Sequence, residues 1–600
     1  MRRLRTALRA HSHAAATCRN YASIVRDASA MLQEHPSHWY PAARECGPRR
    51  LFLHVGPTNS GKTHSALQAL LRAHSGMYCA PLRLLAWEAS DRANAAGVPC
   101  NLVTGQERTE IEGARHVACT VEMADVGTYH DVAVVDEIQL LGDPHRGWAF
   151  TRALLGLCVS ELHLCGDPAA VPLVKRLVEQ CGDTLEVVTY SRLLPLRVTK
   201  TPVSVDDVAA GDAFVAFSRR DVHALRNVVE EETKHRCAIV YGGLPPEART
   251  AQAQLFNNAR GKSGCSVLAA SDAIGMGLNL SIGRVVFSTL QKFDGTSRRH
   301  LNAAEIRQIA GRAGRYGSKF DEGLVSAMAS DGSCVELEHL RLALAQAPVP
   351  VPTAGIFPLP EHIERIAALH PRHGLCGALW AFASVTPPPD FHLRSMEDVI
   401  AAAGHVAPLG LPLRTQLTLA LSPVDTGQPA ALAALLAFAR NLAASGVVPL
   451  VAAGGSMPSM TRLPRTQAEL ASLEEGSQIC DLYIWLAARM PEAFPEVEVA
   501  RTMRSAIGVA IMEGLHLLAR PPATRAKAKA QAKAAQSAFD AATQAVAVAL
   551  AETEAMSPRS GFGAWQSYTS SVREAKQHAQ AVEKGAGRSG ANAISVLTSL

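Results

Sequence analysis

A glycine-rich segment that ends in lysine and threonine lies near the start of the chain. It fits the pattern G-x-x-x-x-G-K-[S/T], and its residues are Gly56, Pro57, Thr58, Asn59, Ser60, Gly61, Lys62 and Thr63. It follows the apolar run Leu51–Val55 and precedes a stretch of helical periodicity. Glycines let backbone N–H groups face a phosphate chain, the helix N-terminus and lysine attract its charge, and a threonine hydroxyl suits Mg²⁺. This phosphate-binding loop (P-loop) therefore predicts an ATP site, in which Lys62 contacts phosphate and Thr63 the metal ion.

Two carboxylates follow a second apolar run. Val132–Val135 leads directly into Asp136 and Glu137, which places both at the carboxyl end of a buried strand, the edge where α/β sheets bind ligands. We expect Asp136 to hold Mg²⁺ through water, and Glu137 to polarise the water that attacks the γ-phosphate. An acidic pair alone is typical of a solvated loop, so this assignment depends on the P-loop upstream.

A third segment, Gln308–Arg315, carries two arginines far downstream of the carboxylates. Arg312 and Arg315 are three residues apart, so we expect them to share a helix face. Guanidinium groups that come from a second lobe can neutralise the charge that develops in phosphoryl transfer. Gln308, Arg312 and Arg315 are therefore candidate catalytic residues together with Glu137.

The elements that position these residues alternate between short β-rich runs and helical stretches. The runs are Leu51–Val55, Val132–Val135, Leu162–Cys165, Cys237–Tyr241, Val267–Ala270 and Val285–Ser288. Such alternation predicts an α/β fold with parallel sheets wrapped by helices. We expect a basic segment with a linker over 1–46, α/β lobes over 47–195 and 196–346, a mainly helical domain over 347–520, and an Ala/Lys-rich, then Gly/Ser-rich, flexible tail over 521–600.

Composition limits the class of protein. The chain has 600 residues, of which 48% are apolar and 19% charged, which excludes a disordered chain. The net charge of +5 permits a polyanionic partner without requiring one. A membrane span needs about 18 uninterrupted apolar residues, and the sequence offers no such run. The 13 cysteines form no C-x-x-C pair, so we expect reduced thiols and no zinc site.

The first residues have the composition of a mitochondrial transit peptide. Met1–Arg26 contains six arginines, and the first acidic residue is Asp27. A disordered basic terminus has the same composition, so this pattern alone leaves both interpretations open.

The P-loop, the Asp136–Gln139 box and the Gln308–Arg315 box resemble those of superfamily-two helicases. Further motifs resemble the RNA helicase of the mitochondrial degradosome (Suv-three type), in its plant and algal form. They are Pro81–Ala86, Thr120–Met123, Arg146–Ala149, Leu164–Ala169, Tyr241–Pro246 and Ser271–Asn279. The resemblance runs from about Trp39 to Leu518. It implies two RecA-like lobes that share an ATP cleft, and a helical domain that completes an RNA channel.

The resemblance also implies function. Members of this family are ATP-driven motors that translocate on single-stranded RNA, open duplexes and often supply an exoribonuclease, so we expect a mitochondrial location, with the nucleus as a further destination. Gly275 joins the nucleotide site by this resemblance. The candidate contacts to the RNA backbone are Arg83, Thr104, Gly105, Thr120, Ser218 and Ser271. Gln139 departs from the DEAD-box pattern and no adenine-reading motif lies upstream, so we expect loose base selectivity.

Two alternatives stay open at this point. One is a DNA or RNA/DNA-hybrid helicase, because none of these motifs reads the 2′-hydroxyl group. The other is an ATP-gated RNA-binding scaffold that recruits a nuclease. A P-loop kinase or transport ATPase is disfavoured, because neither class needs the Gln308–Arg315 box on a second lobe.

Overall fold

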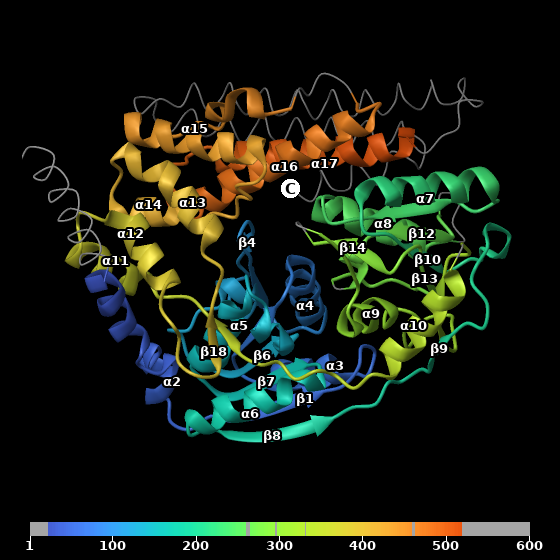
Figure 1. Ribbon diagram of the computed structural model, residues 1–600, viewed down its shortest axis with the longest axis horizontal. Helices are drawn as coiled ribbons and strands as arrows, with labels where there is room; N and C mark the ends of the chain where they lie inside the picture. The colour runs from blue at the N-terminus through green and yellow to red at the C-terminus, as the bar shows by residue number, and fades with distance from the viewer. Residues whose placement is uncertain are drawn as a thin grey trace, which may run out of the picture. The chain divides into compact units, whose positions relative to one another are not determined.

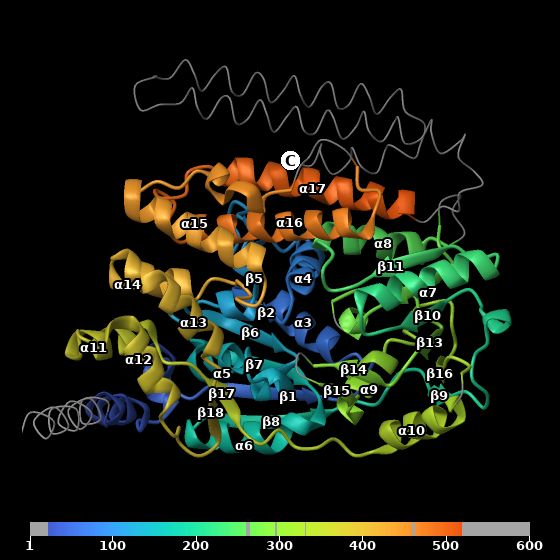
Figure 2. The ribbon, with the colours of Figure 1, turned by 45° about the horizontal axis from the view of Figure 1, so that its top comes forward.

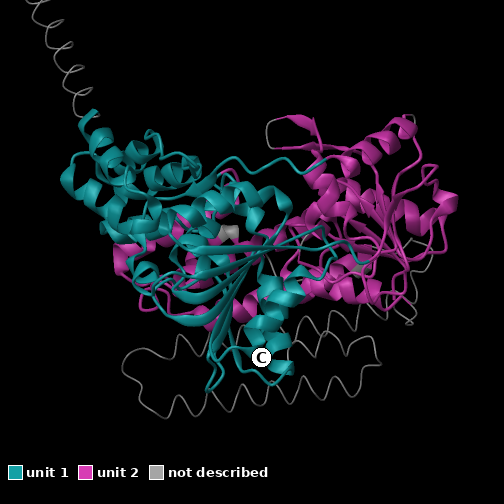
Figure 3. Ribbon diagram, turned by 90° about the horizontal axis from the view of Figure 1, so that it is seen from below, with its two compact units in different colours: residues 1–193, 347–426 teal, residues 194–346, 427–600 magenta. Residues whose placement is uncertain are grey.

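The computed structural model describes residues 22–259, 264–275, 277–294, 297–330, 332–458 and 463–518. The expected flexible tail over 521–600 and most of the basic segment lie outside these residues. The chain forms two compact units, which Figure 3 shows in different colours. Unit 1 comprises residues 1–193 and 347–426, and unit 2 comprises residues 194–346 and 427–600. The chain therefore passes between the units three times, at 193/194, 346/347 and 426/427.

Unit 1 is built on an eight-stranded sheet in the order β4-β3-β5-β2-β6-β7-β1-β8. Figure 1 labels β4, β6, β7, β1 and β8 of this sheet. Its strands are β1 (Arg50–Val55), β2 (Gly76–Ala80), β3 (Cys100–Val103), β4 (Arg108–Thr109), β5 (His116–Thr120), β6 (His130–Asp136), β7 (Val159–Gly166) and β8 (Thr184–Thr189). Every pair is parallel except β3–β4. All strands except β4 therefore end at one edge of the sheet.

Helices cover both faces of this sheet, as the apolar strand residues require. Ala66 of α3 (Lys62–Arg72) and Ala86 of α4 (Arg83–Ala95) pack in one apolar cluster with Val134 of β6. The α5 (Gly147–Gly156) and α6 (Val171–Gln180) helices pack in another cluster with Val135 and β1. Alternate residues of β6 thus face opposite layers, as period-two geometry dictates. The strands predicted from the runs in this part of the chain are confirmed.

Residues 22–46 belong to the core of unit 1 and are not a linker. Residues 22–32 form a helix, followed by η1 (Pro36–Trp39) and α2 (Pro41–Glu45). Ile24, Ala28 and Leu32 are each 0% exposed and share the cluster that contains β1. Because they are four residues apart, these three side chains lie on one face of the helix. The overall composition of the region, which is rich in arginine, does not reveal this apolar face.

The helical region after residue 346 is shared between the two units. The elements β17 (Ala354–Ile356), α11 (Pro360–Leu369), α12 (Gly374–Ala383), β18 (Phe391–Leu393), α13 (Glu397–Val406) and α14 (Leu413–Ala420) belong to unit 1. The helices α15 (Pro429–Ser445), α16 (Gln467–Ala487) and α17 (Val497–Leu518) belong to unit 2. Ile363 and Leu379 are buried with β1, whereas Leu470 and Ile507 are buried with β11. The segment expected to be one helical domain thus covers two different sheets.

Unit 2 contains a parallel six-stranded sheet in the order β11-β12-β10-β13-β16-β9. Its strands are β9 (Leu196–Val198), β10 (Asp212–Val215), β11 (Cys237–Val240), β12 (Val267–Ala270), β13 (Arg284–Phe287) and β16 (Gly323–Ala327). The helices are α7 (Arg219–Glu232), α8 (Pro246–Asn257), α9 (Ala303–Ala310) and α10 (Ser333–Ala345). A small hairpin pairs β14 (Gln291–Phe293) with β15 (Arg298–His300). Figure 2 shows α7 and α8 beside β11, which they contact.

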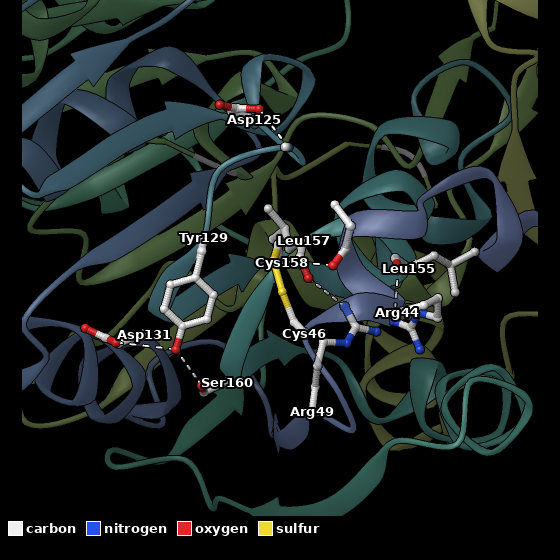
Figure 4. Close-up of a disulfide and its surroundings, with 12 residues drawn as sticks. Arg44, Cys46, Arg49, Asp125, Tyr129, Asp131, Leu155, Leu157, Cys158 and Ser160 are labelled. Carbon is white, nitrogen blue, oxygen red and sulfur yellow. Dashed lines mark hydrogen bonds between the residues drawn. A yellow bond between two sulfur atoms is a disulfide. The ribbon is translucent and has the colours of Figure 1, made fainter.

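One pair of cysteines corrects the expectation of reduced thiols throughout. Cys46 and Cys158 form a disulfide (Figure 4), because α2 packs on α5 and brings their Cα atoms to 6.3 Å. The other ten cysteines among the described residues are free thiols.

None of the helices in the described parts of the chain is long and apolar enough to cross a membrane.

A buried ion pair joins three elements at the amino-terminal edge of the unit 1 sheet. The Arg49 side chain is 1% exposed and the Asp183 side chain 0%. Arg49 donates from Nη2 to Asp183 Oδ2 at 2.6 Å and from Nη1 to the Leu157 carbonyl at 3.0 Å, so the starts of β1 and β8 and the end of α5 are tied together. Figure 4 shows the bond to Leu157.

We predict that Asp183→Ala lowers the free energy of unfolding of unit 1 by about 3–5 kcal/mol, because it leaves the Arg49 guanidinium buried without its anion. Urea unfolding followed by tryptophan fluorescence measures the change. Arg50→Ala is the control, because its side chain is 69% exposed and lies 3.9 Å from Glu161, a geometry worth about 0–1 kcal/mol. Equal losses in the two variants would contradict the role given to the buried pair.

Candidate nucleotide site and RNA-facing edge

The P-loop joins β1 to α3 in a conformation that only particular residues allow. Gly61 (φ 86°) and Asn59 (φ 64°) have left-handed backbones. A Cβ atom on Gly56 would lie 2.6 Å from the Tyr190 carbonyl oxygen, so the close approach of two chain segments requires glycine there. The Ser60 hydroxyl is buried and finds no hydrogen-bond partner among the described residues. An unsatisfied donor in a loop that opens a helix fits an anionic ligand.

The two residues after the P-loop glycine point in different directions. The ammonium of Lys62 donates to the carbonyl oxygens of Gly56 and Pro57 at 3.2 and 3.3 Å, so it lies folded over the loop. The hydroxyl of Thr63 donates to Asp136 Oδ1 at 3.2 Å. Lys62, the predicted phosphate contact, thus lies on the P-loop, and Thr63 and Asp136, the predicted metal ligands, lie next to each other.

Asp136 ends β6 and is held by hydrogen bonds on both oxygens. Oδ1 accepts from the Thr63 hydroxyl and from the Glu137 N–H at 3.1 Å, and Oδ2 accepts from the Tyr78 hydroxyl at 2.9 Å. Burial, together with the nearby Glu137 charge, raises the pKa of Asp136 to about 6. Tyr78 is not among the site residues predicted from the sequence. A polar side chain within the buried strand β2, the neighbour of β6, was the signal that could have found it.

Glu137 has a left-handed backbone (φ 59°), which is uncommon for a residue with a side chain. Its Oε2 accepts from Gln139 Nε2 at 2.6 Å, and Gln139 Oε1 accepts from the Asp167 N–H at 3.0 Å. A Cβ atom on Gly166 would lie 2.6 Å from Gln139 Oε1, so that glycine leaves room for the amide. Gln139, which departs from the DEAD-box pattern, therefore orients the candidate base against the loop that follows β7.

Oxygen ligands at this site suit a hard divalent cation. The Thr63 hydroxyl and the Asp136 carboxylate lie 3.2 Å apart, and Mg²⁺ is bound in proteins by one or two such groups together with substrate phosphates. The described residues contain no group of three or more His, Cys, Asp or Glu side chains that could hold a metal ion by themselves. The side chains present therefore fit Mg²⁺ that arrives with a nucleotide.

In unit 2, the prediction that Arg312 and Arg315 share a helix face is wrong. Helix α9 ends at Ala310, and both arginines follow it in turns. The chain must leave the helix here, because Ala313 forms a bridge with Ile282 and Gly314 (φ 63°) packs on the Gly323 backbone so closely that a Cβ atom would collide with it.

Three of the predicted unit 2 residues meet nonetheless. Arg312 Nε donates to the Gly275 carbonyl oxygen at 2.9 Å, and a Cβ atom on Gly275 would lie 3.6 Å from Gln308 Cγ. Gln308 lies in the last turn of α9, and Gly275 ends η6 (Asp272–Gly275) after β12. Arg315 follows Gly314 and is half-buried. Gly275, Gln308 and Arg312 thus form one cluster, with Arg315 on the adjoining turn.

The candidate RNA contacts of unit 1 lie at neighbouring strand ends. Arg83 begins α4 after β2, Thr104 and Gly105 follow β3, and Thr120 ends β5, in a sheet whose order here is β3-β5-β2. Arg83 Nη1 donates to Gln106 Oε1 at 2.7 Å. The P-loop and Asp136 follow β1 and β6 of the same sheet, so both sets of residues share its carboxyl edge.

The two candidate RNA contacts of unit 2 are local caps. Ser218 Oγ accepts from the Asp221 N–H at 3.0 Å at the start of α7, and Ser271 Oγ accepts from the Ala273 N–H at 3.1 Å after β12. They follow the adjacent strands β10 and β12. The structure therefore brings them to one sheet edge, and their contact with RNA stays a prediction.

Family comparisons cover most of the chain. Residues 36–190 match the DEXQ-box helicase domain of Suv3, and residues 203–317 match the helicase conserved C-terminal domain. Residues 401–443 match the Suv3 C-terminal domain 1, and residues 470–517 match the ATP-dependent RNA helicase SUV3 C-terminal domain.

Full-length relatives agree with these matches. The chain is 46% identical over 485 residues to the DExH-box ATP-dependent RNA helicase DExH16, mitochondrial, of Arabidopsis thaliana, which covers 80% of this chain and 83% of the relative. It is 47% identical over 483 residues to the ATP-dependent RNA helicase SUV3, mitochondrial, of Oryza sativa subsp. japonica, in an alignment that covers 80% of this chain and 82% of the relative. The human ATP-dependent RNA helicase SUPV3L1, mitochondrial, is 39% identical over 492 residues, covering 80% and 62%. With two parallel α/β units, a helical C-terminal region and these relatives, the chain belongs to the Suv3 family of superfamily-two, ATP-dependent RNA helicases.

Proposed function

We propose that the chain couples ATP hydrolysis to movement along single-stranded RNA and so separates RNA duplexes, in the degradation of mitochondrial RNA. The observation that carries the proposal is the shared edge of the unit 1 sheet. The P-loop follows β1 and Asp136 ends β6, while the candidate RNA contacts lie just after β2 and β3 and at the end of β5. Because these strands belong to one sheet, a change in the P-loop or at Asp136 when nucleotide binds can shift the loops that contact RNA.

The nucleotide site supports hydrolysis by direct attack of water. The P-loop N–H groups and Lys62 bind the phosphates, and the Glu137 carboxylate, fixed by Gln139, accepts a hydrogen bond from the attacking water. Thr63 and Asp136 would hold Mg²⁺, which when bound supplies positive charge against the β- and γ-phosphates. Arg312 and Arg315 of unit 2 neutralise the charge that develops on the transferred group.

The residues that we assign to the RNA grip offer no group that distinguishes one base from another. Hydroxyl, backbone and guanidinium groups at strand ends contact phosphates and sugars, which bind RNA of any sequence. Arg83, Thr104, Gly105 and Thr120 hold RNA on unit 1, and Ser218 and Ser271 hold it on unit 2. Because each unit grips the strand separately, ATP-driven closing and reopening of the units moves one grip past the other.

The cellular setting follows from the relatives and the basic first residues. Those relatives are named mitochondrial, which supports a mitochondrial location for this chain. We further propose the matrix as its compartment, the nucleus as a second destination and an exoribonuclease as its partner. Ile24 is the first buried residue of the described core, so removal of a transit peptide before residue 22 would leave that core whole.

We predict that single-stranded RNA stimulates ATP hydrolysis by the wild type, and that Lys62→Ala reduces the stimulated rate at least about 100-fold, because a preorganised charge at the phosphates is lost. Steady-state hydrolysis with RNA, with DNA and without polymer measures this. Overhang duplexes of RNA, DNA and hybrid then test strand separation. A wild type that neither polymer stimulates would rule out the translocating motor, and ATP-dependent RNA binding without strand separation would favour the scaffold.

We predict that Glu137→Gln retains nucleotide affinity but slows hydrolysis about 10²–10⁴-fold, because the amide cannot polarise the attacking water. Binding of a fluorescent ATP analogue and single-turnover hydrolysis separate the two effects. Gln139→Ala should slow hydrolysis less, since it only frees the Glu137 side chain. Normal hydrolysis by Glu137→Gln would show that another group is the base.

We predict that Arg315→Ala binds ATP as the wild type does but loses about 10³-fold in rate, as expected for an arginine that acts on the transition state. Arg312→Ala should also lose protein stability, because its guanidinium holds the Gly275 carbonyl oxygen. Comparing ATP affinity, single-turnover rate and melting temperature distinguishes these roles. A large loss of ATP affinity in Arg315→Ala would place this residue in ground-state binding instead.

A further inference from the structure

The segment that connects the two units lies against the P-loop before it leaves unit 1. Strand β8 ends at Thr189, and the next residue, Tyr190, donates its N–H to the Val55 carbonyl oxygen at 2.8 Å. Its hydroxyl lies 2.9 Å from His54 Nδ1. The connector therefore starts beside the last residues of β1, where the P-loop begins.

The next residues of the connector contact the middle of the P-loop. Arg192 Nη1 donates to the Thr58 carbonyl oxygen at 3.0 Å and to Thr58 Oγ1 at 3.3 Å. The Leu193 N–H donates to the Asn59 carbonyl oxygen at 3.1 Å. Two successive carbonyl groups of the loop are thus held by two successive residues of the connector.

These contacts determine which way the loop amides point. In a trans peptide the C=O of one residue and the N–H of the next point in opposite directions. When Arg192 holds the Thr58 carbonyl, the Asn59 N–H is turned away from Arg192, and the Leu193 contact does the same for the Ser60 N–H. Amides turned away from the connector point to the side on which a phosphate would bind, and the contacts hold the left-handed Asn59 backbone (φ 64°) in that orientation.

The connector is anchored again almost at once in unit 2. The Pro195 carbonyl oxygen accepts from the Gly323 N–H at 2.8 Å, and β9 begins at Leu196. The backbone of Gly323 packs on Gly314. Gly314 lies in the turn that carries Arg312 and Arg315, which we call the arginine turn. In the sequence, only Leu194 lies between Leu193, which is bonded to the P-loop, and Pro195, which is bonded to Gly323 beside the arginine turn.

We propose that Arg192 is a positioning residue for ATP hydrolysis, which holds the P-loop open to phosphate and links the loop to the connector that leads to the arginine turn. The proposal rests on the ATPase activity proposed above and assigns a role to a residue outside the helicase motifs. Because the Arg192 and Leu193 contacts are kept when phosphate binds, any change in the Thr58–Asn59 backbone at the nucleotide is passed directly to the connector.

The environment of Arg192 suits this role. Its side chain is half-buried, and burial lowers the pKa of the guanidinium to about 10, so it stays charged at neutral pH. A charged donor makes a stronger hydrogen bond to a carbonyl oxygen than a neutral one does. Lysine would keep the charge but offers no planar pair of donors, so it should replace arginine only in part.

The test compares Arg192→Ala, Arg192→Lys and the control Arg50→Ala, whose arginine lies at the opposite end of β1 from the P-loop. We expect Arg192→Ala to raise the KM for ATP and the Kd of a fluorescent ATP analogue about tenfold, the effect of one hydrogen bond from a charged donor. The kcat should fall less than about threefold, because Glu137 and the arginine turn are untouched. Arg192→Lys should recover part of the affinity, and Arg50→Ala should change neither constant.

The outcomes separate this proposal from the proposed function. If the wild type hydrolyses ATP and Arg192→Ala leaves KM and Kd unchanged, the positioning role is wrong. An equal loss in Arg50→Ala, or a fall in melting temperature that accounts for the loss in Arg192→Ala, would also overturn it. If the wild type shows no RNA-stimulated hydrolysis, the proposed function fails, and the Kd comparison still tests Arg192.

Discussion

The placement of the candidate phosphate, metal and RNA ligands depends on one constraint of parallel β-sheets, namely that parallel strands end at the same edge. In unit 1 this constraint collects groups that are far apart in the sequence, such as Thr63 and Asp136. The same rule in unit 2 places Ser218 and Ser271 after adjacent strands. The sheets in turn depend on apolar layers on both faces, which the helices supply. The same sheet therefore positions the functional groups at its carboxyl edge and buries apolar side chains on both of its faces.

The strands and the P-loop could be predicted because their signals are local: a short apolar run, a glycine pattern, a helix start. Contacts made by tertiary structure could not. The end of α9 before Arg312 is imposed by a distant glycine, Gly323, which a helical pattern does not reveal. Tyr78 looks like any aromatic residue in a buried strand until its neighbour strand is known. Arg192 lies 134 positions from Thr58, and its loop has no motif.

The hydrogen bonds from Glu137 through Gln139 to Asp167 give the glutamine of this DEXQ box a structural role that an aspartate could not fill. Its amide has a donor and an acceptor, and both are used: Nε2 donates to the carboxylate and Oε1 accepts from a backbone N–H. An aspartate has no donor for Glu137 and would repel it. The glutamine thus links the end of β6 to the end of β7 and holds the carboxylate without adding charge beside phosphates.

The return of the chain to unit 1 after residue 346 has a consequence for the order of folding. The unit 1 sheet is complete at residue 189, yet the helices over 360–420 that bury Ile363 and Leu379 against its core are made only after all of unit 2's sheet. Helices α5 and α6 already cover the face of the sheet in this core, but the apolar residues of the same core that Ile363 and Leu379 bury stay exposed for some 170 further residues during synthesis or on passage through a membrane pore. Until α11 and α12 dock, the nascent chain therefore exposes apolar surface of the kind that molecular chaperones protect.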